Sequence, residues 1–312
     1  MKKTIGLILV SMTLMLSLAA CQKAGYGDST TNPPSTQTAN PPVVSTGNPD
    51  STTPVVNNAS ITVISREEGS GTRGAFTELF GVLNADKVDQ TTDYAEITNS
   101  TSVMMTSVAG NPDAIGYISL GSLNDTVKAA KIDGIEATVD NINNGSYTIS
   151  RPFNLASKEG ASALAQDFIG FIMSTNGQDI IESNGYIRVE DTGAYSGTKP
   201  SGKIVVGGSS SVSPVMEKLI EGYLVINAGA DIELQTSDSS TGMNNTIDGV
   251  CDIGMASREL KASEHDAGLK DITLAMDGIA VIVNNGSPVN SLTKEQVRQI
   301  FTGEITNWSE IH

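Results

Sequence analysis

Short runs of β-branched and aliphatic residues alternate with helical apolar patterns from about residue 60 onward. Strands are predicted for six such runs: 61–64, 114–120, 203–206, 232–235, 253–256 and 278–283. Apolar positions that recur every three or four residues predict helices over 72–83, 161–174, 212–226 and 293–301. This alternation is typical of α/β layers with largely parallel strands, and the length of the region favours two sheets over one.

The first 21 residues follow a different pattern. Lys2 and Lys3 precede an apolar run from Ile5 to Leu18, which is too short to span a bilayer comfortably, and small residues then lead to Cys21. This order is typical of a secretory signal peptide, and its closing Leu-Ala-Ala-Cys resembles the lipobox of bacterial lipoproteins. A plain signal peptide with an incidental cysteine is the alternative. We expect a lipoprotein signal peptide over 1–20 and lipidation of Cys21, with the lipid as the only membrane anchor, on the extracytoplasmic face of the cell membrane.

Residues 21–59 are dominated by Ser, Thr, Asn, Pro and Gly. Few apolar side chains are present from which a core could form, so we expect a disordered, flexible tether. The folded body is therefore expected to begin near residue 60.

Charge and composition narrow the classes of function. The chain has 19 Lys and Arg against 35 Asp and Glu, and loss of Lys2 and Lys3 with the signal peptide takes the net charge from −16 to −18. Nucleic acid binding needs a basic surface, so no nucleic acid partner is expected. Two His and two Cys leave little scope for His-based catalysis or a Cys-based zinc site, and we expect no metal, no cofactor and no enzyme activity.

Small hydroxyl residues and glycines cluster where predicted strands run into the segments that follow them. Four such loops are present: 66–73, 207–214, 237–242 and 257–260. A helix N-terminus offers up to four free N–H donors and about half a positive charge, and glycine allows the backbone to approach a ligand. Because ligands of α/β sheets lie at the carboxyl ends of the strands, we expect these loops to converge on an anion. Ordinary N-capping accounts for any one loop alone, but four loops together, two of them with arginine, favour the anion site.

Six blocks of sequence cover much of the body: 64–73, 114–121, 208–214, 252–260, 277–283 and 300–308. The first is Ile-Ser-Arg-Glu-Glu-Gly-Ser-Gly-Thr-Arg and the last is Ile-Phe-Thr-Gly-Glu-Ile-Thr-Asn-Trp. At these blocks the chain resembles the phosphate-binding lipoproteins of bacterial ABC importers, the PstS family. The resemblance implies a periplasmic-binding-protein-like α/β fold, in which two lobes joined by two crossing segments close on a ligand.

The order of the blocks differs from the order in that family. There the Gly-Ser-Ser-Ser-Val-Ser-Pro block comes first, and the block equivalent to 300–308 runs directly into the block equivalent to 64–73. The chain therefore resembles a circularly permuted member, in which residues 190–202 join the family's two termini. Its own ends, near Ser60 and His312, are then expected to be neighbours. A fragment of a tandem gene that pairs halves between molecules is the alternative.

The permuted order implies where the lobes lie. One lobe is expected at 60–150 plus 284–312, and the other at 151–283. The crossings are expected near 150–156 and 278–283.

The resemblance also assigns residues to a phosphate site. Those on one lobe are Arg66, Ser70, Gly71 and Thr72, and those on the other are Ser210, Ser211 and Ser239. The arginine would supply a charge-assisted grip, and the hydroxyls and backbone N–H groups would add hydrogen bonds.

One position departs from the family. Well-known members have an aspartate just after the Ala-Ser that corresponds to Ala256-Ser257, and this carboxylate accepts the proton of HPO₄²⁻ and so rejects sulfate. Here the position is occupied by Arg258, and Asp238, in a loop where relatives often have glycine, is the candidate acceptor. Both residues are therefore included in the predicted site.

We expect an extracytoplasmic monomer that captures inorganic phosphate between its lobes and delivers it to the permease subunits of an ABC importer. The alternative is a binding or sensing protein for another oxyanion, such as sulfate, molybdate or arsenate, without a transport role. A surface phosphatase is a third hypothesis, for which the sequence offers no metal cluster and no nucleophile–base pair.

Overall fold

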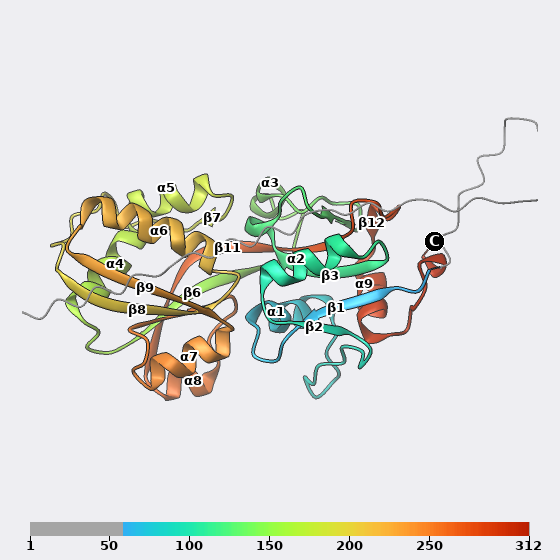
Figure 1. Cartoon of the computed structure of the whole chain (residues 1–312), viewed down its shortest axis with the longest axis horizontal. Coiled ribbons are helices and arrows are strands. Elements are labelled where there is room, and N and C mark those ends of the chain that lie inside the picture. The colour runs from blue at the N-terminus through green and yellow to red at the C-terminus, as the bar shows by residue number, and fades with distance from the viewer. Residues whose placement is uncertain (1–58, 312) are drawn as a thin grey trace, which may run out of the picture. The chain divides into compact units, whose positions relative to one another are not determined.

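The computed structural model describes residues 59–311. The predicted signal peptide, Cys21 and all but the last residue of the predicted tether lie outside the described residues. Between residues 59 and 311, no helix is both long enough and apolar enough to span a bilayer. This part of the chain is a mixed α/β structure with two large hydrophobic cores, one for each lobe (Figure 1).

One continuous sheet runs through both lobes in the strand order β2–β1–β3–β11–β6–β10–β8–β9. In that order the strands are Glu96–Thr98, Thr62–Arg66, Ala114–Ser119, Leu269–Val283, Ser150–Lys158, Ile253–Ala256, Gly202–Ser209 and Ala230–Ser237. Two short strands, β4 (Lys128–Ala129) and β7 (Ile187–Arg188), also pair with β11. A separate two-stranded sheet consists of β5 (Lys131–Ile132) and β12 (Ser291–Leu292).

Strand pairs that involve β6 or β11 differ in direction from the other pairs of the large sheet. Pairs of β1 with β2 and β3, and pairs of β8 with β9 and β10, are parallel. In contrast, β11 is antiparallel to β3 and β6, and β6 is antiparallel to β10. The predicted parallel pairing is confirmed for β1 with β2 and β3 and for β8 with β9 and β10, whereas β6 and β11 add antiparallel pairs to each lobe. The prediction of two main sheets is wrong, because β6 and β11 join the strands of both lobes into one.

The helices pack against the sheet within each lobe. In the first lobe they are α1 (Gly71–Phe80), α2 (Thr101–Gly110), α3 (Val139–Asn143) and α9 (Lys294–Thr302), with short 3₁₀ turns at Leu120–Ser122 and Trp308–Glu310. In the second lobe they are α4 (Ala163–Met173), α5 (Thr175–Ser183), α6 (Ser213–Ile226), α7 (Ser239–Ile247) and α8 (Ala262–Asp266). Figure 1 shows α5 and α6 on one side of β6, β8 and β9, and α7 and α8 on the other.

Predicted and observed elements agree best where a strand is buried. The strand predicted at 253–256 is β10, whose four residues are all buried. The helix predicted over 72–83 ends at Phe80, because Gly81 adopts a left-handed conformation (φ 72°) and its N–H caps the helix. The strand predicted at 278–283 is only the end of the 15-residue β11, whose first half lacks an apolar run because Lys270, Asp271 and Ile272 are exposed.

The two crossing segments are β6 and β11, which pair along most of their length. The first core contains Ile149 and the residues Ile279–Val283, while the second contains Phe153 and Ala275. The first crossing therefore lies where it was predicted. The second lobe boundary, predicted after residue 283, lies near Gly278 instead, because Ile279–Val283 pair with β3 and belong to the first core.

An ion pair joins the crossing strands at the point where they pass between the cores. Arg151 and Asp277 are opposite each other in the β6–β11 register, with Arg151 Nη2 3.2 Å from Asp277 Oδ2, and both side chains are almost fully buried. The Gly121 N–H donates to the other carboxylate oxygen over 3.2 Å. Burial raises the pKa of Asp277 and lowers that of Arg151, and their mutual attraction opposes both shifts.

The two ends of the described chain lie side by side. Ser60 and Asn307 form an isolated antiparallel bridge. The Ile61 N–H donates to the Thr306 carbonyl over 2.8 Å, and the Trp308 N–H donates to the Ala59 carbonyl over 3.1 Å. The predicted proximity of the ends of the folded body is confirmed for residues 59–61 and 306–308.

Candidate anion-binding site

Arg66 is the last residue of β1, at the carboxyl end of this parallel strand. Its backbone N–H donates to the phenol oxygen of Tyr117 over 3.1 Å, and the Ser65 hydroxyl lies 2.8 Å from the same oxygen. Burial raises the pKa of Tyr117 to about 12, although its bonds with Ser65 and Arg66 act in the opposite direction. The phenol is therefore uncharged at neutral pH and fixes the end of β1 to β3.

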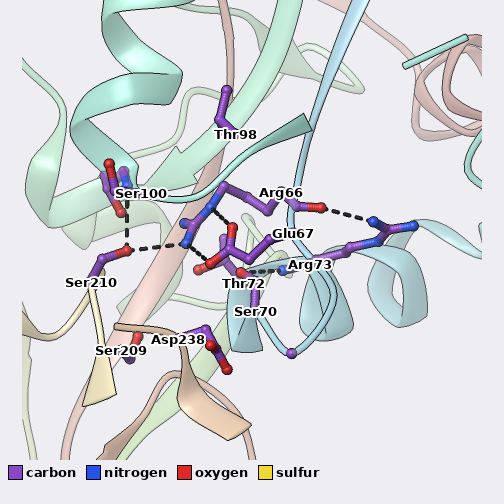
Figure 2. Close-up of polar contacts among 12 residues, drawn as sticks. Arg66, Glu67, Ser70, Thr72, Arg73, Thr98, Ser100, Ser209, Ser210 and Asp238 are labelled. Atoms are coloured by element: carbon purple, nitrogen blue, oxygen red, sulfur yellow. Dashed lines mark hydrogen bonds and ion pairs between the residues drawn. The ribbon is translucent and has the colours of Figure 1, made fainter. Parts of the chain in front are cut away.

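The Arg66 guanidinium is buried between the two lobes. It is 2% exposed, and its Nε and Nη2 donate to Glu67 Oε2 and Oε1, each over 2.7 Å. Nη2 also donates to Ser210 Oγ, in the second lobe, over 3.1 Å. Figure 2 shows the guanidinium plane between the Glu67 carboxylate and the Ser210 hydroxyl. The cation is thus held in a fixed plane by an adjacent carboxylate and faces a hydroxyl of the opposite lobe.

Ser70, Gly71 and Thr72 form the beginning of α1, and all three are buried. Ser70 is the N-cap, since its hydroxyl accepts the Arg73 N–H over 3.3 Å. Thr72 Oγ1 lies 2.7 Å from Ser211 Oγ of the second lobe. The first turn of α1 therefore faces the other lobe across a short polar contact.

The second lobe contributes hydroxyls from the beginnings of two helices. Ser210 and Ser211 lie between β8 and α6, and Ser239 is the first residue of α7. Ser239 Oγ accepts the Ser257 N–H over 3.1 Å, and the Ser209 hydroxyl donates to Ser257 Oγ over 2.9 Å. These buried hydroxyls hold the loops of the second lobe together, on the side that faces Arg66 and Thr72.

A fourth helix beginning at the site was not predicted. The hydroxyl of Ser210 accepts the Thr101 N–H over 3.4 Å, and Thr101 Oγ1 lies 3.2 Å from Ser211 Oγ. Thr101 is the first residue of α2, and Ser100 is its N-cap. The preceding strand β2 has only three residues, two of them exposed, so no apolar run marked this junction. In the sequence, a serine suited to N-capping (Ser100) ahead of the apolar Val103 could have indicated that a helix begins here.

The fourth predicted loop differs from the other three. No helix begins directly after Ser257, because the next helix, the five-residue α8, starts at Ala262. Arg258 extends from this loop to Glu264 and Ser240, with Nη2 2.7 Å from Glu264 Oε1. No hydrogen bond or ion pair in the described part of the chain joins Arg258 to Arg66.

Asp238 caps the helix that follows it, α7. As the N-cap of α7 its carboxylate accepts the Thr241 N–H over 2.9 Å and the Thr241 hydroxyl over 2.6 Å. Figure 2 places it below Ser70, apart from the bonds that link Arg66 with Ser210. Of the nine predicted site residues, the structure brings seven together and leaves Arg258 and Asp238 at the margin.

The arrangement is suited to a small oxyanion. One buried guanidinium, several hydroxyls and the first turns of α1, α2, α6 and α7 approach one another, and each first turn has N–H donors that its helix does not use. Between residues 59 and 311, no group of three or more His, Cys, Asp or Glu side chains is placed to hold a metal ion. The guanidinium, the hydroxyls and the unused N–H groups of these turns are donors of the kind that bind an oxyanion.

Comparison with known proteins places this geometry in a family. A model described as a PBP superfamily domain matches residues 49–176 and 193–311. The chain is 55% identical over 260 residues, 82% of this chain and 89% of the relative, to the phosphate-binding protein PstS 2 of Streptococcus agalactiae serotype V. It is 33% identical over 115 residues, 36% of this chain and 38% of the relative, to the phosphate-binding protein PstS of Bacillus subtilis.

A solved structure agrees with these sequence matches. It is the crystal structure of a phosphate ABC transporter, phosphate-binding protein from Streptococcus pneumoniae TIGR4, 44% identical, with a TM-score of 0.65 and coverage of 81% of this chain and all of that one. The predicted two-lobed, periplasmic-binding-protein-like fold is confirmed. The chain belongs to the PBP superfamily and, within it, to the family of PstS phosphate-binding proteins.

Proposed function

We propose that this protein captures inorganic phosphate between its lobes for an ABC importer. The observation that supports this most is the buried Arg66, which lies at the junction of the lobes among hydroxyls from both. The similarity to PstS phosphate-binding proteins, among them the solved phosphate-binding protein from Streptococcus pneumoniae, supports phosphate as the anion.

Each of the seven clustered residues has a role in this proposal. Arg66 supplies the charge, and Ser70, Thr72, Ser210, Ser211 and Ser239 donate hydroxyls, with backbone N–H groups at Gly71 and Ser211. The net charge of −16 does not oppose capture at close range, because exposed charges beyond about 8 Å are screened at physiological salt. Local donors, rather than the overall field, then set the affinity.

Isothermal titration calorimetry of Arg66→Ala tests the site. Loss of the buried charge and its hydrogen bonds is expected to weaken phosphate binding by more than about a hundredfold, so that no binding is seen at micromolar phosphate. Arg298→Ala is the matched control, because Arg298 is paired with Glu295 and Glu304 within the first lobe. Unchanged affinity in Arg66→Ala would remove Arg66 from the site.

Competition with sulfate, molybdate and arsenate in the same titrations distinguishes phosphate from the alternative oxyanions. We expect only arsenate, which resembles phosphate in charge and protonation, to displace phosphate efficiently. Displacement by sulfate at similar concentrations would favour a general oxyanion receptor.

The location and partners follow from the same function. The chain acts as a monomer outside the cytoplasm, tethered by a lipid on Cys21, and passes phosphate to the permease subunits. The lipobox-like sequence and the membership of an importer family support this arrangement. Membrane fractionation of cells that express Cys21→Ala tests it, since the variant is expected to leave the membrane fraction.

The order of the chain is the product of circular permutation in this proposal. The match to the Bacillus subtilis relative is confined to about a third of each chain, which is what a changed block order produces. The match to the Streptococcus agalactiae relative extends over most of both chains, so the permuted order is shared with that branch of the family. The pairing of residues 59–61 with 306–308 further supports it.

A further inference from the structure

A second contact joins the lobes outside the cluster around Arg66. The backbone carbonyl of Gly69, in the first lobe, accepts two hydrogen bonds from Ser240 of α7, in the second lobe. One comes from the Ser240 N–H and the other from its hydroxyl, each over 3.2 Å. One residue at the beginning of α7 thus donates both hydrogen bonds to one carbonyl of the first lobe. This pair of bonds joins the lobes at that point.

The Arg258 side chain contacts Ser240 within the second lobe. Its Nη2 donates to Ser240 Oγ over 3.3 Å, so the hydroxyl accepts from Arg258 while it donates to Gly69. A hydroxyl that accepts a bond from a cation becomes a better donor, and its rotor is fixed in the direction of the carbonyl. Arg258 therefore acts on the contact with Gly69 through Ser240, and its hydrogen bonds in the described part of the chain are to residues of the second lobe.

Glu264 fixes the guanidinium of Arg258. The two side chains form two hydrogen bonds, from Nη2 to Oε1 over 2.7 Å and from Nη1 to Oε2 over 2.9 Å. Glu264 Oε2 also accepts the Lys261 N–H over 2.7 Å. The Arg258 and Glu264 side chains are 12% and 7% exposed, so solvent competes little with the pair.

The Glu264 carboxylate keeps its charge in this setting. Burial favours the neutral form, but the bonds from Arg258 and the Lys261 N–H hold its pKa below the ordinary range. The Glu264 carboxylate is consequently charged at neutral pH and gives Arg258 a fixed anionic partner.

We propose that Gly69, Ser240, Arg258 and Glu264 form a latch that holds the lobes closed over the anion, with Arg258 as a positioning residue that acts through Ser240. The inference rests on the proposed phosphate capture for its ligand, but it concerns residues that need not touch the anion. It also gives a role to the arginine that stands where well-known relatives have aspartate.

The latch affects release more than capture. Its bonds cross the junction and exist only when the lobes are closed, so they do not contribute to the encounter of phosphate with an open site. Their loss is expected to raise the phosphate dissociation rate constant about tenfold, with an association rate constant unchanged within about twofold.

Stopped-flow measurements on the full chain test this, with a fluorescent phosphate sensor that traps released phosphate. Ser240→Ala and Arg258→Ala are each expected to show the faster release, and Ser240→Thr, which keeps a hydroxyl, is expected to restore a slow rate. The double variant is expected to release no faster than Ser240→Ala, because Arg258 acts through the Ser240 hydroxyl. Arg298→Ala, which removes a similar arginine–glutamate group from one lobe, is the control and is expected to behave as the wild type.

Two results would overturn the latch. Dissociation rates of Ser240→Ala and Arg258→Ala equal to that of the wild type would show that the contact does not hold the lobes. Complete loss of phosphate binding in folded Arg258→Ala would instead make Arg258 a ligand of the anion.

Small-angle X-ray scattering at saturating anion separates the latch from the proposed function. The latch predicts a larger radius of gyration for Ser240→Ala than for the wild type in the presence of whichever of phosphate, arsenate, sulfate or molybdate the wild type binds. If the wild type fails to bind phosphate, the proposed function is wrong, and the scattering comparison still decides the latch. Equal radii in the two proteins would count against it.

Discussion

Gly71 shows how closely the lobes approach at the level of single residues. It is the first residue of α1, and a Cβ atom there would collide with Ser239 Oγ and lie 2.7 Å from Ser257 Oγ. Both neighbours belong to the second lobe. The absence of a side chain is therefore required by contact between the lobes rather than by the geometry of α1 itself.

Gly71→Ala is expected to weaken phosphate binding by about fivefold to a hundredfold or more while the protein remains folded. The added methyl group obstructs only the closed arrangement, and overpacking of a fixed site costs about 1–3 kcal/mol or more. Calorimetry gives the affinity and thermal unfolding gives the stability. Gly74→Ala, in the same helix but with no atom near its added Cβ, is the control and is expected to bind normally and to be slightly more stable. Equal affinities in the two variants would contradict the close approach.

At the scale of elements, several hydrogen bonds attach the segment between β7 and β8 to the second lobe, and two of them converge on one carboxylate. Asp167 of α4 accepts hydrogen bonds from the Tyr195 hydroxyl, from the Tyr223 hydroxyl over 2.6 Å and from the Thr198 N–H over 2.7 Å. Burial raises the pKa of Asp167, but these bonds outweigh it and hold the pKa below its ordinary value of 3.8. The predicted linker over 190–202 is thus anchored by specific bonds.

The Asp167 contacts are expected to weaken in acid. Because its folded pKa lies below the unfolded value of 3.8, its contribution to stability is complete above that pH and is lost as the pH falls through the folded value. Urea unfolding should therefore show a difference in free energy of unfolding between wild type and Asp167→Asn at pH 7 that shrinks near pH 3. The exposed Asp125→Asn serves as the control and should track the wild type at both values. A difference of the same size at both pH values would show that the Asp167 charge is not involved.

The sequence predicted individual strands and loops better than it predicted which of them lie together in the fold. Buried apolar runs identify strands such as β3 and β10, and the loops after β1 and β8 were recognised because glycines and hydroxyls follow an apolar run directly. The beginning of α2 was missed because β2 is short and exposed, so Thr101 had no pattern ahead of it. The contact between Gly69 and Ser240 could not be predicted from the sequence either, since the two residues are 171 positions apart and only the folded chain brings them together.

At the scale of the whole molecule, we expect that the order of the chain can be altered without loss of its contacts. The described ends already pair, through Ala59–Ile61 and Thr306–Trp308, and the segment 190–202 connects β7 to β8. Few of the contacts that define the lobes depend on which of these two connections is covalent.

A rearranged chain tests the proposed permutation. Residues 60 and 311 would be joined by a short Gly/Ser linker, and the chain would be opened between Ser196 and Gly197, within the segment 190–202. We expect this protein to fold and to bind phosphate with an affinity within about threefold of the original, because such surface connections tolerate permutation. Circular dichroism and calorimetry provide the comparison. A rearranged chain that folds but pairs into dimers would support exchange of halves between molecules instead.

The antiparallel pairing of β6 and β11 determines how the lobes move. These strands form one hydrogen-bonded ribbon that extends into both cores, interrupted by a register shift between Thr273 and Ala275 and tied by the Arg151–Asp277 pair. A ribbon of this kind flexes out of its plane much more readily than its strands slide past each other, since sliding would break every bond of the ladder at once. We therefore expect the lobes to open and close by bending of this ribbon, so that each closure returns Ser210 to the same position beside Arg66.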